Sequence, residues 1–378
     1  MSPVPQKLLL FLLSIAALLK QTTAASPSNQ VLTCYAPLAI PTPNQIDANL
    51  CTHLLIIGGT YIDYDGLIVF PPSETIQQYV QLKKQNENLK ILVTLTPNNE
   101  RMSQIVLSDA LMNQLANTVA YYLTGNSLDG FDIDWEFPAW SQDAKKTDKK
   151  GLSTLLKWIR NRFDQVSHTR LLLTLTVGAP YTIVRKGYDV TAINRYVDYL
   201  QIMTYDFHDF SRLEPITGFN APLYPANYEF LILRKMNSDY SLKYWLNRGL
   251  NKNITVFGIP TYGKGFRLLT KYLHYPYAPA IGFSDLGSTP DYPTVCNLTQ
   301  NGFNYVWNAN AATPYWYKDY NWLAAEDERS VRAKTDYVKS QGIAGAMVFG
   351  LHTDDFAGVC GKGAFPLVKA INDELYNV

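Results

Sequence analysis

Three carboxylates alternate along one short stretch of the chain. Residues 129–138 read Asp-Gly-Phe-Asp-Ile-Asp-Trp-Glu-Phe-Pro, so Asp132, Asp134 and Glu136 are spaced two residues apart. If this stretch is a β-strand, the three side chains point to one face, because side chains alternate with a period of two. Like charges held so close raise one another's pKa values. Carboxyl groups with perturbed pKa values are typical of acid–base chemistry.

A structural interpretation of the same stretch is also open. An edge strand of an antiparallel sheet could bury Phe131, Ile133 and Trp135 and leave the acids in water. The choice depends on the elements that surround the stretch, because a strand buried on both faces would place the acids inside the protein instead.

Short β-rich runs recur along the chain and would position these acids. Eight are found, at residues 31–35, 53–57, 91–96, 130–136, 171–177, 199–203, 255–259 and 345–349. Helix-like segments with apolar residues at three- and four-residue intervals lie between several of them, such as 112–123 and 152–163. Alternating β and α units favour a parallel sheet, and eight units favour an α/β fold of the (β/α)₈ TIM barrel type over a doubly wound open sheet. Catalytic groups of such barrels lie at the C-terminal ends of strands, where Glu136 would stand.

One segment does not fit the alternating pattern. Residues 264–330 are rich in Tyr, Pro, Asn and Asp, and the segment is too long for one βα loop. We expect a small α+β insertion domain there, between strands seven and eight. The barrel would then consist of residues 26–263 and 331–378.

The N-terminus is typical of a secretory signal. Lys7 precedes an apolar run at residues 8–19, and small residues follow at 23–25. The run is too short to span a bilayer comfortably. We therefore expect residues 1–25 to be a signal peptide and the protein to be secreted and extracellular. Asn253 and Asn297 begin Asn-x-Thr sequons, which are predicted glycosylation sites in a secreted chain.

Cysteine usage and charge limit the other partners. The four cysteines permit three pairings, of which Cys34–Cys51 and Cys296–Cys360 are the local ones. Their spacing is unlike that of a zinc site and the chain has 5 His, so we expect no metal and no cofactor. A net charge of +1 gives no basic excess for nucleic acid. We expect a monomer that binds neither nucleic acid nor membrane.

Several ordered motifs resemble those of glycoside hydrolase family 18, the chitinases and chitinase-like lectins. Residues 129–136 match the family pattern Asp-Gly-x-Asp-x-Asp-x-Glu at the end of strand four. Met203-Thr204-Tyr205-Asp206 is similar to the strand-six motif, and residues 258–263, Gly-Ile-Pro-Thr-Tyr-Gly, to the strand-seven motif. Residues 345–348 and 354–356 resemble the strand-eight region. The resemblance covers nearly the whole mature chain, including the insertion domain and the two cysteine pairs.

The resemblance implies retaining hydrolysis of β-1,4-linked N-acetylglucosamine polymers, in which the substrate's own 2-acetamido oxygen attacks the anomeric carbon. It makes Glu136 the general acid and has Asp134 hold the acetamido group, while Asp132 shares charge and protons with Asp134. Tyr205 would donate a hydrogen bond near the acetamido oxygen. The expected partner is chitin or a chito-oligosaccharide. The side chains expected to bind it are Asp206, Met203, Tyr262, Phe349, Tyr35 and Trp135.

The sequence departs from the family pattern around the cleft. The strand-three Ser-x-Gly-Gly is Thr-Leu-Thr-Pro at residues 94–97, and the tryptophan that usually follows is Asn98. The phenylalanine that usually ends strand two falls at Gly58, the strand-eight tryptophan is Phe349, and an arginine of the strand-seven region is Lys264. Each lost aromatic contact would weaken sugar binding by about 0.5–1.5 kcal/mol. Two hypotheses follow. The first is an active hydrolase, which is favoured because the acids are intact. The second is a lectin with weak or no catalytic activity that binds chito-oligosaccharides or another glycan.

Overall fold

Eight parallel strands form a closed barrel in the computed structural model, which describes residues 30–167 and 169–376. The strands are β1 (Val31–Pro37), β2 (His53–Ile57), β5 (Lys90–Leu95), β6 (Gly130–Asp134), β7 (Leu172–Gly178), β8 (Tyr199–Met203), β9 (Thr255–Pro260) and β15 (Gly345–Phe349). Their order around the barrel is β1-β15-β9-β8-β7-β6-β5-β2, and β2 closes the ring on β1. The predicted barrel and its eight strands are confirmed. The predicted signal peptide, residues 1–25, lies outside the described residues.

The acidic strand is enclosed on both sides. β6 pairs in parallel with β5 and with β7, and each of its five residues is buried. Gly130 allows the close approach to β7, because a Cβ at this position would lie 2.4 Å from the carbonyl oxygen of Leu172. The interpretation of the stretch as a half-solvated edge strand is therefore excluded.

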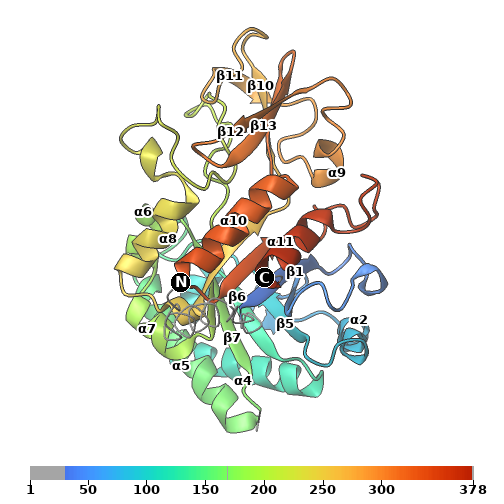
Figure 1. Ribbon diagram of the computed structural model, residues 1–378. Helices are drawn as coiled ribbons and strands as arrows, with labels where there is room; N and C mark the ends of the chain where they lie inside the picture. The colour runs from blue at the N-terminus through green and yellow to red at the C-terminus, as the bar shows by residue number, and fades with distance from the viewer. Residues whose placement is uncertain (1–29, 168, 377–378) are drawn as a thin grey trace, which may run out of the picture.

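Helices cover the outside of the barrel (Figure 1). They are α2 (Ser73–Val80), α3 (Asn99–Ile105), α4 (Asp109–Gly125), α5 (Asp148–Val166), α6 (Tyr181–Gly187), α7 (Val190–Tyr196), α8 (Ser238–Asn247), α10 (Glu328–Gln341) and α11 (Pro366–Tyr376). The two predicted helical segments, 112–123 and 152–163, lie within α4 and α5. In the described part of the chain, no helix has the length and apolar character needed to cross a membrane.

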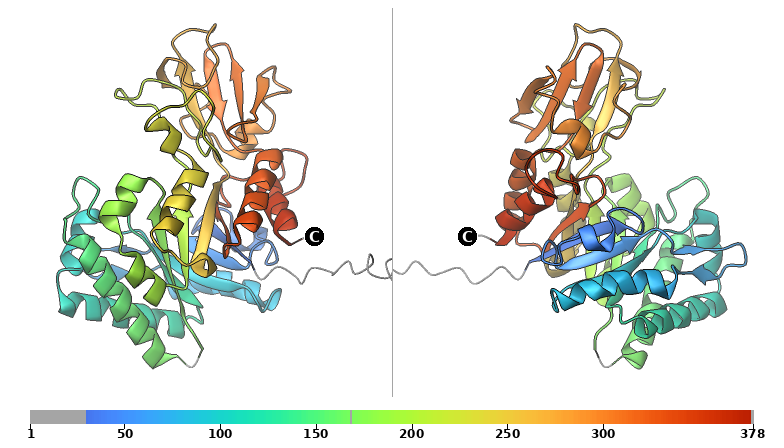
Figure 2. Two further views of the ribbon diagram at one scale, coloured as in Figure 1. Left: turned by 60° about the vertical axis from the view of Figure 1, so that its left-hand side comes forward. Right: turned by 90° about the vertical axis from the view of Figure 1, so that its right-hand side faces the viewer.

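A second sheet stands beyond one end of the barrel (Figures 1 and 2). Its strands are β10 (Lys264–Leu268), β11 (Ala280–Phe283), β12 (Asn304–Asn308), β13 (Thr313–Lys318) and β14 (Asn321–Ala324), in the antiparallel order β11-β10-β14-β13-β12. The chain passes from the C-terminal end of β9 into β10, so the sheet lies on the rim where the barrel strands end. Its own core is built around Trp322, Phe266 and Phe219. The sheet falls within the predicted insertion at 264–330, whose domain boundaries stay a prediction.

Both predicted disulfides are present. Cys34–Cys51 joins β1 to the segment that precedes β2. Cys296–Cys360 links residues 64 apart in sequence, from the end of the short helix α9 (Tyr292–Val295) to the loop after β15. The second bond therefore ties the segment that carries the rim sheet to the barrel.

Candidate active site

The three acids form a column that rises from the barrel interior to its mouth. Asp132 and Asp134 are 0% and 5% exposed, whereas the side chain of Glu136, two residues beyond Asp134, is open to solvent. Phe131 and Ile133 point the other way, into the core between the strands and the helices. The period-two alternation of the sequence thus places carboxylates inside the barrel and apolar groups outside it.

Asp132 lies at the bottom of this column and is held there by hydrogen bonds. Its Oδ2 accepts a hydrogen bond of 2.8 Å from the Tyr35 hydroxyl, and its Oδ1 accepts one of 2.6 Å from the Thr174 hydroxyl. The Gln201 amide also donates to Oδ1, at 3.3 Å. Burial raises the pKa of Asp132, while the hydrogen bonds from Thr174 and Tyr35 partly oppose that rise.

Asp134 has an unpaired oxygen. Its Oδ1 is buried and has no hydrogen-bond partner among the described residues. Burial is the main cause that raises the pKa of Asp134 well above its usual range, and the charges of Glu136 and Asp132 raise it further. An unsatisfied buried carboxyl oxygen is costly, so it is suited to accept a hydrogen bond from a ligand.

Glu136 is placed by its backbone as well as by its strand. Its carbonyl oxygen accepts a hydrogen bond of 2.9 Å from the amide nitrogen of Asn99, and the Asn99 oxygen accepts one of 2.7 Å from Trp135 Nε1. Glu136 is exposed at the mouth but its carboxyl is partly enclosed there, and this partial burial, followed by the charge of Asp206, raises its pKa. Asn99 was not predicted from the sequence, because nothing in the pattern separates it from the neighbouring Asn98.

Two of the predicted binding residues, Tyr35 and Trp135, are buried in this structure. Tyr35 is 0% exposed, and its hydroxyl is used beneath the site, on Asp132. Trp135 is 1% exposed and lies in the core outside the barrel. Tyr35 contacts Asp132 directly, and Trp135 contacts Asn99, which binds the backbone of Glu136, so both side chains support the column.

A second group of polar residues faces the acids from the ends of β8 and β9. The Tyr262 hydroxyl donates to Asp206 Oδ2 at 2.9 Å, and Lys264 Nζ lies 2.8 Å from Asp206 Oδ1. Asn220 joins the two loops, since its Oδ1 accepts from the Asp206 N–H at 3.1 Å and its Nδ2 donates to the Tyr262 carbonyl at 2.9 Å. Asn220 was also missed from the sequence, because it lies on a long loop outside every motif.

Tyr205 supplies a hydroxyl donor near the column. Its only hydrogen-bond contact among the described residues is to Met347 Sδ at 3.8 Å, and sulfur is a weak acceptor. Burial and the neighbouring Tyr262 raise the pKa of Tyr205 well above its usual value, so the hydroxyl keeps its proton.

Phe349 forms an aromatic floor at the centre of the barrel mouth. Its ring centroid lies 5.4 Å from that of Tyr35, 6.0 Å from that of Tyr205 and 6.2 Å from that of Tyr262. The ring remains partly exposed at the end of β15. A flat ligand such as a sugar could stack on it.

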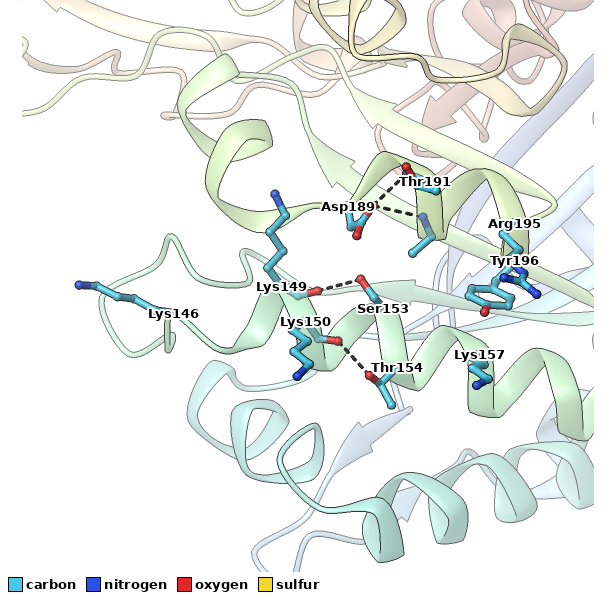
Figure 3. Close-up of a pocket in the computed structure, with 11 residues that line it drawn as sticks. Lys146, Lys149, Lys150, Ser153, Thr154, Lys157, Asp189, Thr191, Arg195 and Tyr196 are labelled. Atoms are coloured by element: carbon cyan, nitrogen blue, oxygen red, sulfur yellow. Dashed lines mark hydrogen bonds between the residues drawn. The ribbon is translucent and has the colours of Figure 1, made fainter.

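A cavity of about 420 Å³ opens beside Glu136. Its walls are mainly apolar and include Phe137, Trp140, Met203 and Ile232. A larger hollow of about 560 Å³ lies between α5 and α7 and contains none of the residues of the acidic column (Figure 3). We place the active site at the smaller cavity, because of the two only this one is lined by a residue of the column, Glu136.

The sequence model of the family described as glycosyl hydrolases family 18 matches residues 26–354 of this chain. The chain belongs to this family. Mouse (Mus musculus) chitotriosidase-1 is 30% identical over 348 residues, which cover 88% of this chain and 74% of that protein. The family 18 resemblance of the sequence motifs is therefore confirmed.

Solved structures of family 18 proteins share the fold. The Ostrinia furnacalis Group IV chitinase has a TM-score of 0.84 at 30% identity, over 92% of this chain and 99% of that one. Human YKL-39, described as a pseudo-chitinase with retained chitooligosaccharide binding properties, has a TM-score of 0.84 at 26% identity, over 92% and 99%. The chain is thus similar both to a chitinase and to a protein described as a pseudo-chitinase.

Two of the departures from the family 18 pattern, at Gly58 and Asn98, leave these positions without an aromatic side chain. Gly58 has a φ of +88°, and no atom lies within 4 Å of the place where a Cβ would stand. The Asn98 side chain is turned onto α3, where its oxygen accepts hydrogen bonds from the N–H groups of Glu100 at 3.0 Å and Arg101 at 3.4 Å. Neither position offers a ring on which a sugar could stack.

Proposed function

We propose that this family 18 chain hydrolyses β-1,4-linked N-acetylglucosamine oligomers or polymers, with Glu136 as the proton donor. The observation that carries the proposal is the complete column of acids, in which Asp134 has a buried oxygen without a partner. Because the raised pKa values belong to two neighbouring carboxyl groups, they favour the retention of one proton by the pair, which Glu136 carries when it acts as the general acid.

In this mechanism Glu136 protonates the glycosidic oxygen as the bond to the anomeric carbon breaks. The substrate's acetamido oxygen attacks that carbon on the opposite face and forms a cyclic oxazolinium ion. Asp134 accepts a hydrogen bond from the acetamido N–H through its unpaired Oδ1, and its negative charge stabilises the cation. Water then opens the ring and gives up a proton to Glu136, which returns the acid to its starting state.

The remaining site residues bind and orient the sugar. Phe349 stacks under the ring at the point of cleavage, and Tyr205 donates a hydrogen bond to the acetamido group. Asp206 and Tyr262 are held together by their 2.9 Å hydrogen bond and contact sugar hydroxyls. Met203 lines the apolar cavity beside Glu136, where the leaving part of the chain would lie.

The second candidate function is a lectin that binds the same oligosaccharides with little or no turnover. The open space at Gly58 and the capping role of Asn98 favour it, because both remove aromatic grip. The similarity to human YKL-39 is in keeping with this alternative. We favour the hydrolase because Glu136, the group that transfers the proton, is present.

Turnover of a fluorogenic N-acetylglucosamine oligomer by the purified protein separates the two functions. We expect release of the fluorophore by the native chain and none by Glu136→Gln. Glutamine is nearly the same size and shape as glutamate, but it cannot act as an acid. Glu136→Gln must unfold at the same urea concentration as the native chain, which shows that the loss of release is not a loss of folding. Binding of the oligomer without release at any pH would support the lectin instead.

We also propose that the chain is secreted and glycosylated at Asn253 and Asn297. Two disulfides support secretion, since such bonds persist in oxidising compartments. Asn253 is exposed in the turn before β9, and Asn297 is partly exposed. Secretion from a eukaryotic host should yield a chain that begins near residue 26 and loses mass on treatment with an N-glycosidase. A cytosolic product with an intact N-terminus would contradict this proposal.

A further inference from the structure

A strongly basic groove runs along the outer wall of the barrel between α5 and α7. It encloses about 560 Å³ and is separate from the acidic column. Figure 3 shows Lys149 and Ser153 on the side of α5 that faces α7, with Arg195 toward the other end. We name this surface the basic groove and define it by its cationic side chains: Lys146, Lys149, Lys150, Lys157 and Arg195.

The charge of the basic groove is not neutralised from within the protein. None of its five cations forms an ion pair with a carboxylate in residues 30–167 and 169–376. The one acid in its lining, Asp189, caps α7 by accepting hydrogen bonds from the N–H groups of Thr191 at 2.9 Å and Ala192 at 3.3 Å. Because the whole chain carries a net charge of only +1, this concentration of positive charge is local.

The two acids near the ends of α5 are engaged elsewhere, and the exposed Asp143, in the loop before the helix, forms no ion pair among the described residues. Asp148, at the start of α5, is buried and its Oδ2 accepts a hydrogen bond of 2.7 Å from the Lys145 N–H. Asp164, near the end of α5, pairs with Arg160 at 3.4 Å. The exposed face of α5 therefore presents lysines without balancing carboxylates.

The shape of the groove fits an extended chain. With a helical rise of 1.5 Å per residue, its lysines on α5, from position 149 to 157, spread over about 12 Å. Ser153 and Thr154 lie in its lining, and both hydroxyls donate to backbone carbonyls of α5, at 2.9 Å and 3.1 Å. Several cations spread along a groove with polar hydroxyls in its lining suit a flexible polymer that carries negative charges along its length.

We propose that the basic groove binds a sulfated, polyanionic glycan. A membrane is a poor fit, because no large apolar side chain between residues 141 and 212 is exposed among those described, and membrane surfaces take up such groups. Single-stranded nucleic acid needs aromatic platforms for its bases. The groove has one aromatic residue, Tyr196, which is half-buried and carries Arg195 at 5.4 Å from its ring centroid. A sulfated sugar chain needs neither exposed apolar side chains nor aromatic platforms, because ionic contacts to its sulfates hold it.

The test is the affinity of the full chain for a heparin-derived octasaccharide, at low salt and at about 0.15 M salt. We expect binding that weakens as salt is raised. The double variant Lys150→Glu/Lys157→Glu should bind about tenfold more weakly. The double variant Lys84→Glu/Lys369→Glu makes the same change of net charge on exposed lysines outside the groove, and it should bind as the native chain does.

Three results would overturn the proposal. They are the absence of binding at low salt, an equal loss of affinity in the two double variants, and tighter binding of single-stranded DNA or of phosphatidylserine vesicles than of the octasaccharide. Cleavage of N-acetylglucosamine oligomers is measured separately on the same proteins. Since the groove contains no residue of the acidic column, we expect cleavage to be unchanged in the groove variant, so the two proposals fail independently.

Discussion

Replacing Asn99 by alanine would disconnect the backbone of Glu136 from the strand-three loop. The Asn99 side chain accepts from Trp135 Nε1 at 2.7 Å and donates to the Glu136 carbonyl at 2.9 Å. Trp135 is 1% exposed, and Asn99 is the partner that its indole N–H has in the structure. We expect Asn99→Ala to lower both stability and the rate of catalysis.

The magnitude follows from these two bonds. An indole N–H left buried and unpaired costs about 1–3 kcal/mol. The Glu136 carbonyl is near solvent and adds less, so we expect a total loss of about 2–3 kcal/mol in the free energy of unfolding. A catalytic group displaced by about 1 Å can lose about 100-fold in rate, so a fall in kcat of about tenfold or more is expected.

The neighbouring Asn98 provides a matched control. Its side chain caps α3 and makes no hydrogen bond with Glu136, so Asn98→Ala should cost about 1 kcal/mol and leave kcat unchanged. Urea unfolding and the initial rate of fluorophore release, measured on both variants, give the comparison. Equal kcat values for the native chain and Asn99→Ala, or equal losses of kcat in the two variants, would refute the positioning role of Asn99.

Three further predictions concern charge and the cleft floor. Asp206→Asn removes a negative charge that raises the pKa of Glu136, so the alkaline limb of the kcat/KM pH profile should move to lower pH; an upward shift would contradict this. In the native chain the buried Glu326 lies 2.6 Å from Lys334 Nζ, and Lys334→Met leaves this carboxylate without its partner. The variant should lose about 3–5 kcal/mol in the free energy of urea unfolding, whereas an unchanged midpoint would show that the pair contributes nothing. Phe349→Trp enlarges the floor and should tighten oligosaccharide binding in calorimetry by about 0.5–1.5 kcal/mol, and weaker binding would argue against stacking there.

The barrel could be predicted from the sequence because its strands are buried on both faces. Continuous apolar runs such as residues 54–57 result from that burial, and the alternation in residues 130–136 shows which side of β6 faces inward. Asp132, Asp134 and Glu136 were therefore located correctly at the level of the strand and its face. The family motifs added Tyr205 and Tyr262, which face these acids from neighbouring strand ends.

The supporting residues could not be predicted, since their roles depend on single-residue differences in three dimensions. Asn98 and Asn99 are identical and adjacent, yet α3 begins between them, so one caps the helix and the other holds Glu136. Tyr35 and Trp135 are aromatic residues near the motifs, but both lie behind the acids and not above them. Sequence spacing alone does not indicate how deep in the barrel a side chain lies.

The most direct test of the mechanism is the anomer first released when the protein cleaves a chito-oligosaccharide, followed by proton NMR. Attack by the substrate's acetamido group, with Asp134 and Glu136 in the roles given above, predicts a product that retains the β configuration. Release of the α anomer would show direct attack by water, and the absence of any product would show that the column of acids does not support catalysis. Either result would contradict the account.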